Sequence, residues 1–153
     1  MPEITQQAPD FTLPRDGGGT LTLSGQRPQA VVLYFYPRDD TPGCTKEAID
    51  FTTLAEAFAA ANTLVIGISK DSAAKHDTFI AKHALTVALV SDTDTNTCEQ
   101  YGTWVEKNMY GKTFMGIERT TFLIDATGKI ARIWRKVKTP GHADAVLEAA
   151  RAL

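Results

Sequence analysis

Apolar residues occur along the chain in two patterns, short continuous runs and stripes with helical spacing. Residues 30–36 and 63–69 are continuous runs with many β-branched and aromatic side chains, and residues 87–90 form a shorter run. A strand with one exposed face alternates apolar with polar residues, whereas a strand buried on both faces does not. The three runs are therefore predicted to be strands that are covered on both faces.

Two pairs of segments are predicted to form β-hairpins. Residues 11–13 and 21–23 alternate apolar with polar side chains and flank a run of three glycines. Residues 120–125 and 129–134 flank a short turn that contains Gly128. Glycine adopts the left-handed backbone conformations that tight turns require. The first pair predicts an N-terminal hairpin, and the second predicts another hairpin near the end of the chain.

Helical spacing appears between these strands. Apolar residues at positions 44, 48, 51, 55 and 58 predict a helix from about residue 42 to 61. Further helices are predicted for residues 72–84, for residues 92–101, and for residues 143–153. Strands that alternate with helices and finish in a hairpin favour an α/β fold with a central mixed β-sheet flanked by helices. We expect a thioredoxin-like fold with an N-terminal hairpin extension, and one domain over residues 1–153, because no repeat or linker interrupts the pattern.

The composition excludes several classes of protein. Of the 153 residues, 43% are hydrophobic and 22% are charged, which is typical of a globular protein rather than a disordered one. Sixteen basic against 18 acidic residues give a net charge of −2, so neither nucleic acid nor a membrane surface is the expected partner. The longest apolar run has 7 residues, and the N-terminus lacks the features of a secretory signal. With only two cysteines, a cytoplasmic protein with reduced thiols is expected.

One of these cysteines lies where a helix is predicted to begin. Thr41 is a preferred N-cap residue and Pro42 is favoured at the first helical position, which puts Cys44 in the first turn. Free backbone N–H groups and the positive end of the helix dipole stabilise a thiolate there. Gly43 would leave room for a small molecule to approach the sulfur. The alternative interpretation is an inert core cysteine within the apolar stripe of its helix.

The residues around Cys44 resemble a known family. Pro37-x-x-x-Thr41-x-x-Cys44 is similar to the peroxidatic motif of the peroxiredoxins, and residues 34–48 resemble their bacterioferritin comigratory protein subfamily. Residues 8–13 resemble the opening of these proteins, and residues 119–125 resemble the strand that carries their active-site arginine. The resemblance implies a thioredoxin-like fold and a thiol peroxidase for hydrogen peroxide and alkyl hydroperoxides, with no metal, haem or flavin.

The resemblance also implies roles for individual residues. The thiolate of Cys44 would attack the peroxide and become a sulfenic acid. Thr41 would hydrogen-bond the peroxide, Arg119 would stabilise the thiolate and the leaving oxygen, and Pro37 would shield the sulfur from water. Glu47 would orient Arg119. The alternatives are a helix cap for Thr41, a surface charge on a strand for Arg119, a strand stop for Pro37 and a solvated helix position for Glu47. Spacing alone favours these alternatives for Arg119, Pro37 and Glu47.

The second cysteine departs from the subfamily pattern. Many members carry a resolving cysteine five residues after the first, where this chain has Ile49, and others carry it in the next helix, where residues 79–81 include none. Cys98 is the only other thiol, so we favour a disulfide that involves it, within a monomer or between the subunits of a homodimer. The alternative is a structural Cys98 and a Cys44 sulfenic acid that thioredoxin, glutaredoxin or a small thiol reduces directly.

Other functions are less well supported by the sequence. A thioredoxin-fold thiol–disulfide oxidoreductase normally requires a Cys-x-x-Cys pair, and Thr41 stands where the first of those cysteines would be. A binding module that retains only the fold would consume no peroxide. His76, His83 and Cys98 lack the compact spacing of metal ligands, and both histidines are predicted to be solvated or partly buried on a helix.

Overall fold

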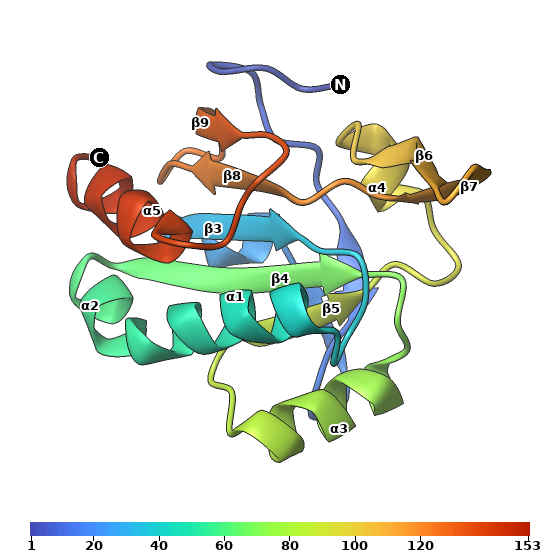
Figure 1. Cartoon of the computed structure of the whole chain (residues 1–153). Coiled ribbons are helices and arrows are strands. Elements are labelled where there is room, and N and C mark those ends of the chain that lie inside the picture. Colours follow the sequence, from blue (N-terminus) through green and yellow to red (C-terminus); the bar gives the residue numbers. More distant parts are fainter.

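A five-stranded mixed sheet lies at the centre of the computed structural model, which describes residues 1–153 (Figure 1). Its strand order is β5-β4-β3-β8-β9, in which β3, β4 and β5 are parallel, β8 is antiparallel to β3, and β9 is antiparallel to β8. The bounds are Ala30–Phe35 for β3, Thr63–Ser69 for β4, Ala88–Ser91 for β5, Thr120–Ile124 for β8 and Ile130–Trp134 for β9. All six residues of β3 are buried, as the continuous apolar run predicted. The mixed sheet confirms the predicted fold class.

Four helices pack on one face of this sheet. They are α1 (Pro42–Thr53), α2 (Ala55–Ala60), α3 (Ala73–His83) and α5 (His142–Arg151). Their apolar side chains join residues of the sheet in a core of 17 buried residues, which includes Cys44. No helix of the chain is long and apolar enough to span a membrane.

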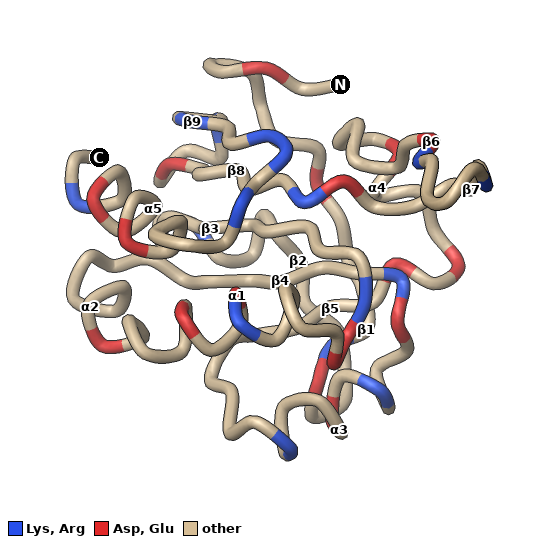
Figure 2. The backbone as a smooth tube through the Cα atoms, viewed as in Figure 1, with Lys and Arg blue, Asp and Glu red and all other residues tan.

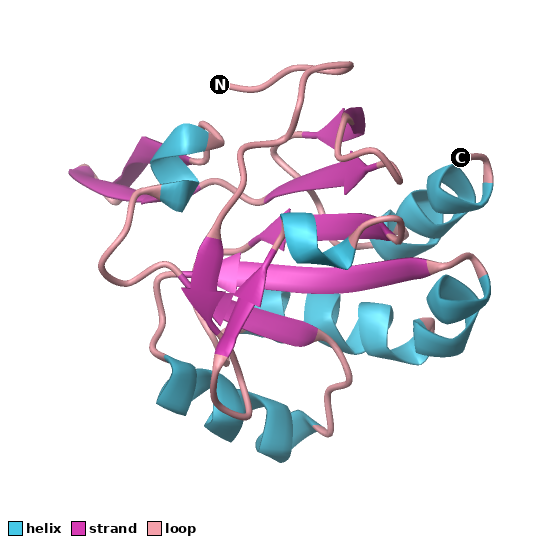
Figure 3. Cartoon of the chain, turned by 180° about the vertical axis from the view of Figure 1, so that it is seen from behind, coloured by secondary structure: helices cyan, strands magenta, loops and turns pink.

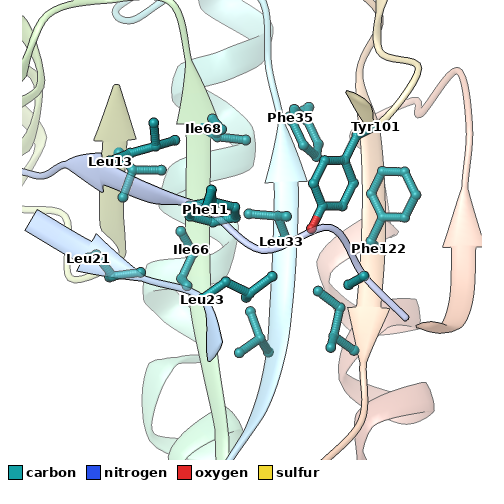
Figure 4. Close-up of a cluster of buried hydrophobic side chains, with 14 of the residues drawn as sticks. Phe11, Leu13, Leu21, Leu23, Leu33, Phe35, Ile66, Ile68, Tyr101 and Phe122 are labelled. Carbon is teal, nitrogen blue, oxygen red and sulfur yellow. The ribbon is translucent and has the colours of Figure 1, made fainter. Parts of the chain in front are cut away.

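The opposite face is covered by different elements (Figure 3). The predicted N-terminal hairpin, β1 (Thr12–Pro14) with β2 (Thr20–Thr22), crosses this face, followed by the 3-10 turn η1 (Ser24–Gln26) and, later in the chain, the short helix α4 (Thr97–Gln100). Together with residues of the sheet, the hairpin and α4 contribute to a second core of 18 buried residues, part of which Figure 4 shows. Because strand side chains alternate between faces, Leu33 and Phe35 of β3 point into this core while Val32 and Tyr34 point into the other.

Two predicted helices are shorter than the sequence pattern indicated. The helix predicted for residues 42–61 is interrupted at Leu54, whose ψ of 12° ends α1 before α2 begins. The hydroxyl of Thr53 donates to the carbonyl oxygen of Ile49, a side-chain bond that tends to bend helices. In the helix predicted for residues 92–101, the carboxylate of Asp92 instead accepts N–H groups from the first turn of α4, so the helix begins only at Thr97.

A third hairpin was not predicted. Strands β6 (Trp104–Met109) and β7 (Lys112–Ile117) are antiparallel and joined by Tyr110 and Gly111, both with positive φ. Most of their side chains are exposed or half-buried, and apolar residues do not alternate regularly with polar ones, so the sequence lacks the pattern of a strand there. The hairpin lies at the same end of the sheet as the carboxyl ends of β3 and β4 (Figure 1).

Candidate active site

Cys44 lies where β3 passes into α1, at the carboxyl end of a central strand. Thr41 holds the N-cap position with an extended backbone, Pro42 is the first helical residue and Cys44 is the third, as the sequence predicted. The thiol is 1% exposed and lies in a cleft of about 1000 Å³. Ligand sites of α/β proteins form at the carboxyl ends of strands, so this position suits a reactive thiol.

Arg119 reaches Cys44 because of strand pairing. β8 runs antiparallel to β3 with Thr120 opposite Phe35, so Arg119 lies at the same end of the sheet as Cys44. Its Nη2 donates to Sγ of Cys44 at 3.4 Å. A Cβ on Gly43 would come within 3.1 Å of the same Nη2. The space that we expected Gly43 to leave for a small molecule therefore admits the guanidinium.

Glu47 holds the other side of this guanidinium. One turn after Cys44, its Oε1 accepts a hydrogen bond from Nη1 of Arg119 at 2.7 Å. Burial raises the pKa of Glu47 from its usual 4.5 to about 7, although Arg119 opposes the change. Burial also disfavours the charge of Arg119, but Glu47 and Cys44 raise its pKa above the usual value. The three residues form a connected chain from carboxylate to guanidinium to sulfur.

The raised pKa of Glu47 predicts how stability depends on pH. Between pH 4.5 and about 7 the folded protein retains a proton on Glu47 that the unfolded chain has lost. The free energy of unfolding contributed by this group therefore falls as the pH rises through that window. In Glu47→Gln, which cannot ionise, we expect a flatter dependence. Urea unfolding at several pH values between 5 and 8 measures the difference.

Glu56→Gln is the matched control for this experiment. Glu56 is exposed on α2 and makes no ion pair, so its replacement should leave the slope of stability against pH as in the wild type. Identical slopes for the wild type and Glu47→Gln would show that Glu47 ionises in the folded protein as it does in the unfolded chain.

Thr41 and Pro37 lie in the same cleft as Cys44. The hydroxyl of Thr41 does not cap α1 but donates to the carbonyl oxygen of Arg38 at 2.9 Å. This bond leaves the lone pairs of the hydroxyl oxygen available for a donor in the cleft. Of the six predicted site residues, the structure brings Cys44, Arg119 and Glu47 into direct contact, places Thr41 and Pro37 around them in the cleft, and leaves Cys98 elsewhere.

A buried polar network that the sequence did not reveal holds the loop before Cys44. Asp39 accepts a hydrogen bond from the Tyr36 hydroxyl at 2.5 Å, and its other oxygen contacts Nδ1 of His76 at 2.6 Å. Nε2 of His76 lies 3.0 Å from the carbonyl oxygen of Val90. The prediction that His76 is solvated or partly buried is wrong, because its side chain is fully buried; His83, with 21% of its side chain exposed, agrees with it. The network ties the active-site loop to α3 and β5.

Cys98 lies on the other side of the sheet from Cys44. It belongs to the core beneath the N-terminal hairpin, whereas Cys44 belongs to the core beneath α1. The residue is fully buried, and its N–H donates to Asp92 at 2.8 Å. Burial and the Asp92 carboxylate raise the pKa of the Cys98 thiol far above its usual value. In this conformation the thiol is protonated and inaccessible.

Comparisons of the sequence and of the structure with known proteins agree with each other. The sequence model of the AhpC/TSA family matches residues 4–133. The peroxiredoxin Bcp of Bacillus subtilis is 46% identical over 146 residues, covering 95% of this chain and 93% of that protein. A structure of the Xanthomonas campestris bacterioferritin comigratory protein, studied for its alkyl peroxide reduction activity, is 46% identical, with a TM-score of 0.88 over 93% of this chain and 90% of that one. A cysteine-to-serine mutant of Xylella fastidiosa PrxQ, 41% identical, has a TM-score of 0.94 over 99% and 97%.

Proposed function

Because this chain belongs to the AhpC/TSA family and is a thiol peroxidase of the peroxiredoxin type, we propose that Cys44 is the thiol that attacks the peroxide. The observation that carries the assignment is the position of Arg119, whose guanidinium contacts both the sulfur of Cys44 and the buried carboxylate of Glu47. Residues 1–153 would act as one catalytic domain, and the two reduced cysteines favour the cytoplasm as its compartment.

The proposed reaction begins with the Cys44 thiolate and a hydroperoxide ROOH. The sulfur attacks the terminal peroxide oxygen, the O–O bond breaks, and the products are the Cys44 sulfenic acid and an alkoxide that is protonated to ROH. Negative charge moves from the sulfur to the departing oxygen. Arg119 and the free N–H groups at the start of α1 are positioned donors for that charge, and Thr41 is a further polar group in the cleft.

The cleft also has an apolar wall suited to the alkyl group of an organic hydroperoxide. Met109, Phe114 and Met115 of the β6–β7 hairpin line it, and each of these side chains is exposed. Exposed large apolar side chains beside a reactive group indicate contact with an apolar ligand. We therefore include alkyl hydroperoxides with hydrogen peroxide as substrates.

For the second half of the cycle we propose that an external thiol, not Cys98, reduces the sulfenic acid. A disulfide requires the two Cα atoms to approach within about 7 Å. Cys44 and Cys98 lie in cores on opposite faces of the sheet, so an internal bond would require one core to open. Thioredoxin, a glutaredoxin-type protein or a small thiol would supply the second sulfur. The disulfide that the sequence led us to favour stays a prediction, and the geometry supports the alternative.

Cys98→Ser tests this proposal. After one equivalent of peroxide in the absence of a reductant, we expect intact mass spectrometry to show one added oxygen on the wild type and on the variant, and no disulfide in either. Dimedone should label Cys44 in both proteins, because it traps sulfenic acids. Steady-state turnover with thioredoxin should differ by less than about twofold between them, since a buried thiol on the far face takes no part in the cycle.

Two outcomes would contradict it. A mass two hydrogens lighter than the reduced wild type would indicate an internal disulfide, and a dimer on non-reducing electrophoresis would indicate a bond between subunits. If either species is absent in Cys98→Ser, then Cys98 is the resolving cysteine, and the disulfide that the sequence led us to favour is correct.

A further inference from the structure

The cleft above Cys44 is strongly cationic, although the chain as a whole is not. Five basic residues line it but only one acidic residue, Asp71, whereas the whole chain has a net charge of −2. Oxygen Oδ2 of Asp71 already accepts hydrogen bonds from Ser69 and from the backbone N–H of Asp39. In Figure 2 the basic segments after β3, after β4 and on the β6–β7 hairpin lie at the same end of the sheet.

Two of the five cations are already paired within the protein. Arg119 is bonded to Glu47, and Lys70 contacts Asp92 at 3.4 Å and Glu99 at 3.1 Å. These ion pairs compensate the charges of Arg119 and Lys70, so neither charge requires a ligand.

The other three cations have no carboxylate within ion-pair distance. They are Arg38 in the loop after β3, Lys75 on α3 and Lys107 on β6. Arg38 and Lys75 also line a smaller adjoining cavity of about 370 Å³. Three aspartates line it too, but each is bonded to other groups of the protein: Asp39 to Tyr36 and His76, Asp40 to Lys82 and His83, and Asp71 to Ser69 and the Asp39 N–H. Lys107 is half-buried and its stem packs over Gly116; burial and the charge of Arg119 lower its pKa. Unpaired cations around a reactive sulfur would attract an anionic ligand.

We propose that the reductant of the Cys44 sulfenic acid is a small thiol that carries a carboxylate, which binds among Arg38, Lys75 and Lys107. This inference rests on the proposed function and names the class of its second substrate. The chain offers no accessible second thiol, so the reducing sulfur must enter the cleft from outside. A cleft of about 1000 Å³ admits a molecule of this size.

The chemistry is balanced by two molecules of the thiol RSH. The first attacks the sulfenic sulfur, forms the Cys44–S–S–R mixed disulfide and releases water. The second attacks that disulfide, restores the Cys44 thiol and leaves as RSSR. In the first step the carboxylate of the thiol lies near the cations of the cleft while its sulfur faces Cys44. In the second step the incoming sulfur attacks the outer sulfur of the mixed disulfide, and Cys44 leaves as the thiolate.

Rates measured with thiols of different charge test the inference. The protein is first oxidised with one equivalent of peroxide, and loss of free Cys44 thiol verifies that step separately. The sulfenic acid is then mixed with β-mercaptopropionate, β-mercaptoethanol or cysteamine at equal thiolate concentration, and intact mass spectrometry follows the mixed disulfide. At low salt we expect the anionic thiol to react about tenfold faster than the neutral one and cysteamine to react more slowly than either. Added salt should reduce the difference.

A double variant and a matched lysine identify the residues responsible. In the double variant Arg38→Gln, Lys75→Gln we expect the ratio of anionic to neutral rates to fall well below that of the wild type, because only Lys107 of the three unpaired cations remains. Lys112→Gln should keep the wild-type ratio. Lys112 is exposed on the β6–β7 hairpin, to which Lys107 also belongs, but Lys112 does not line the cleft. Because the anionic and the neutral thiol are compared on the same protein, an effect of a variant on folding or on the reactivity of Cys44 changes both rates and leaves their ratio unchanged.

Several results would overturn the inference. They are a wild-type ratio of one, an unchanged ratio in the double variant, and an equal loss in Lys112→Gln. A disulfide to Cys98 formed before any thiol is added would also overturn it. Failure of peroxide to oxidise Cys44 at all would instead contradict the proposed function.

Discussion

Cys44→Ser is expected to abolish peroxide consumption, with turnover falling by more than about ten thousandfold. Serine keeps the shape of the side chain at the third position of α1, but it has no sulfur that peroxide could oxidise to a sulfenic acid. No other thiol lies in the cleft to replace it. The measurement is the rate of peroxide loss with dithiothreitol as reductant, together with circular dichroism to verify that the fold is retained.

Cys98→Ser is the control for this experiment, because it removes the other thiol and should still be oxidised by peroxide. If Cys44→Ser retained more than a few per cent of the turnover, another nucleophile would carry the reaction and the assignment would be wrong. If both variants lost activity together, a disulfide between the two residues would be the simplest explanation.

Arg119→Ala is expected to slow the oxidation of Cys44 by about a hundredfold to a thousandfold, the effect of removing one positioned donor from a charged transition state. The guanidinium lies 3.4 Å from the sulfur and is held by a carboxylate that is almost completely buried. Arg119→Lys should restore part of the rate, because an ammonium keeps the charge but lacks the planar pair of donors that spans Cys44 and Glu47. Single-turnover trapping of the remaining thiol measures the rate.

The alanine variant also leaves Glu47 buried without its partner, which destabilises the protein by a separate mechanism. Combining Arg119→Ala with Glu47→Gln removes that buried charge, so a rate that stays low in the double variant assigns the loss to the guanidinium. Arg132→Ala is the matched control, because Arg132 packs over Trp134 on β9 and does not line the cleft. Equal losses in Arg132→Ala and Arg119→Ala would contradict a specific role for Arg119.

The sequence predicted the parts of this fold that local patterns determine. The runs at residues 30–36 and 63–69 became central strands, because only strands covered on both faces hold continuous apolar side chains. The start of α1, and with it the position of Cys44 in the first turn, was predicted correctly from Thr41 and Pro42, although the Thr41 hydroxyl bonds to Arg38 instead of capping the helix.

Tertiary contacts determine the rest of the site, and these could not be predicted from local patterns. The approach of Arg119 to Cys44 follows from the register of β8 against β3, 75 residues along the chain. His76 lies on a helix whose sequence pattern indicates half-exposure, and its contacts with Asp39 and the Val90 carbonyl oxygen explain its burial. Lys107 lies on a hairpin whose apolar and polar residues do not alternate regularly, so neither its strand nor its position in the cleft had a signal in the sequence.

Because the sheet separates the two thiols, the thiol of Cys98 can be used to measure how often the core on its face of the sheet opens. In a Cys44→Ser background the thiol of Cys98 is the only one left, and a thiol-specific reagent reaches it only when the core beneath the N-terminal hairpin opens. The labelling rate then reports the population of open forms, and its dependence on urea distinguishes local fraying from global unfolding. Comparing that rate with the rate of Cys98 labelling in unfolded protein gives the free energy of opening for one face of the sheet, with no added chromophore or engineered cysteine.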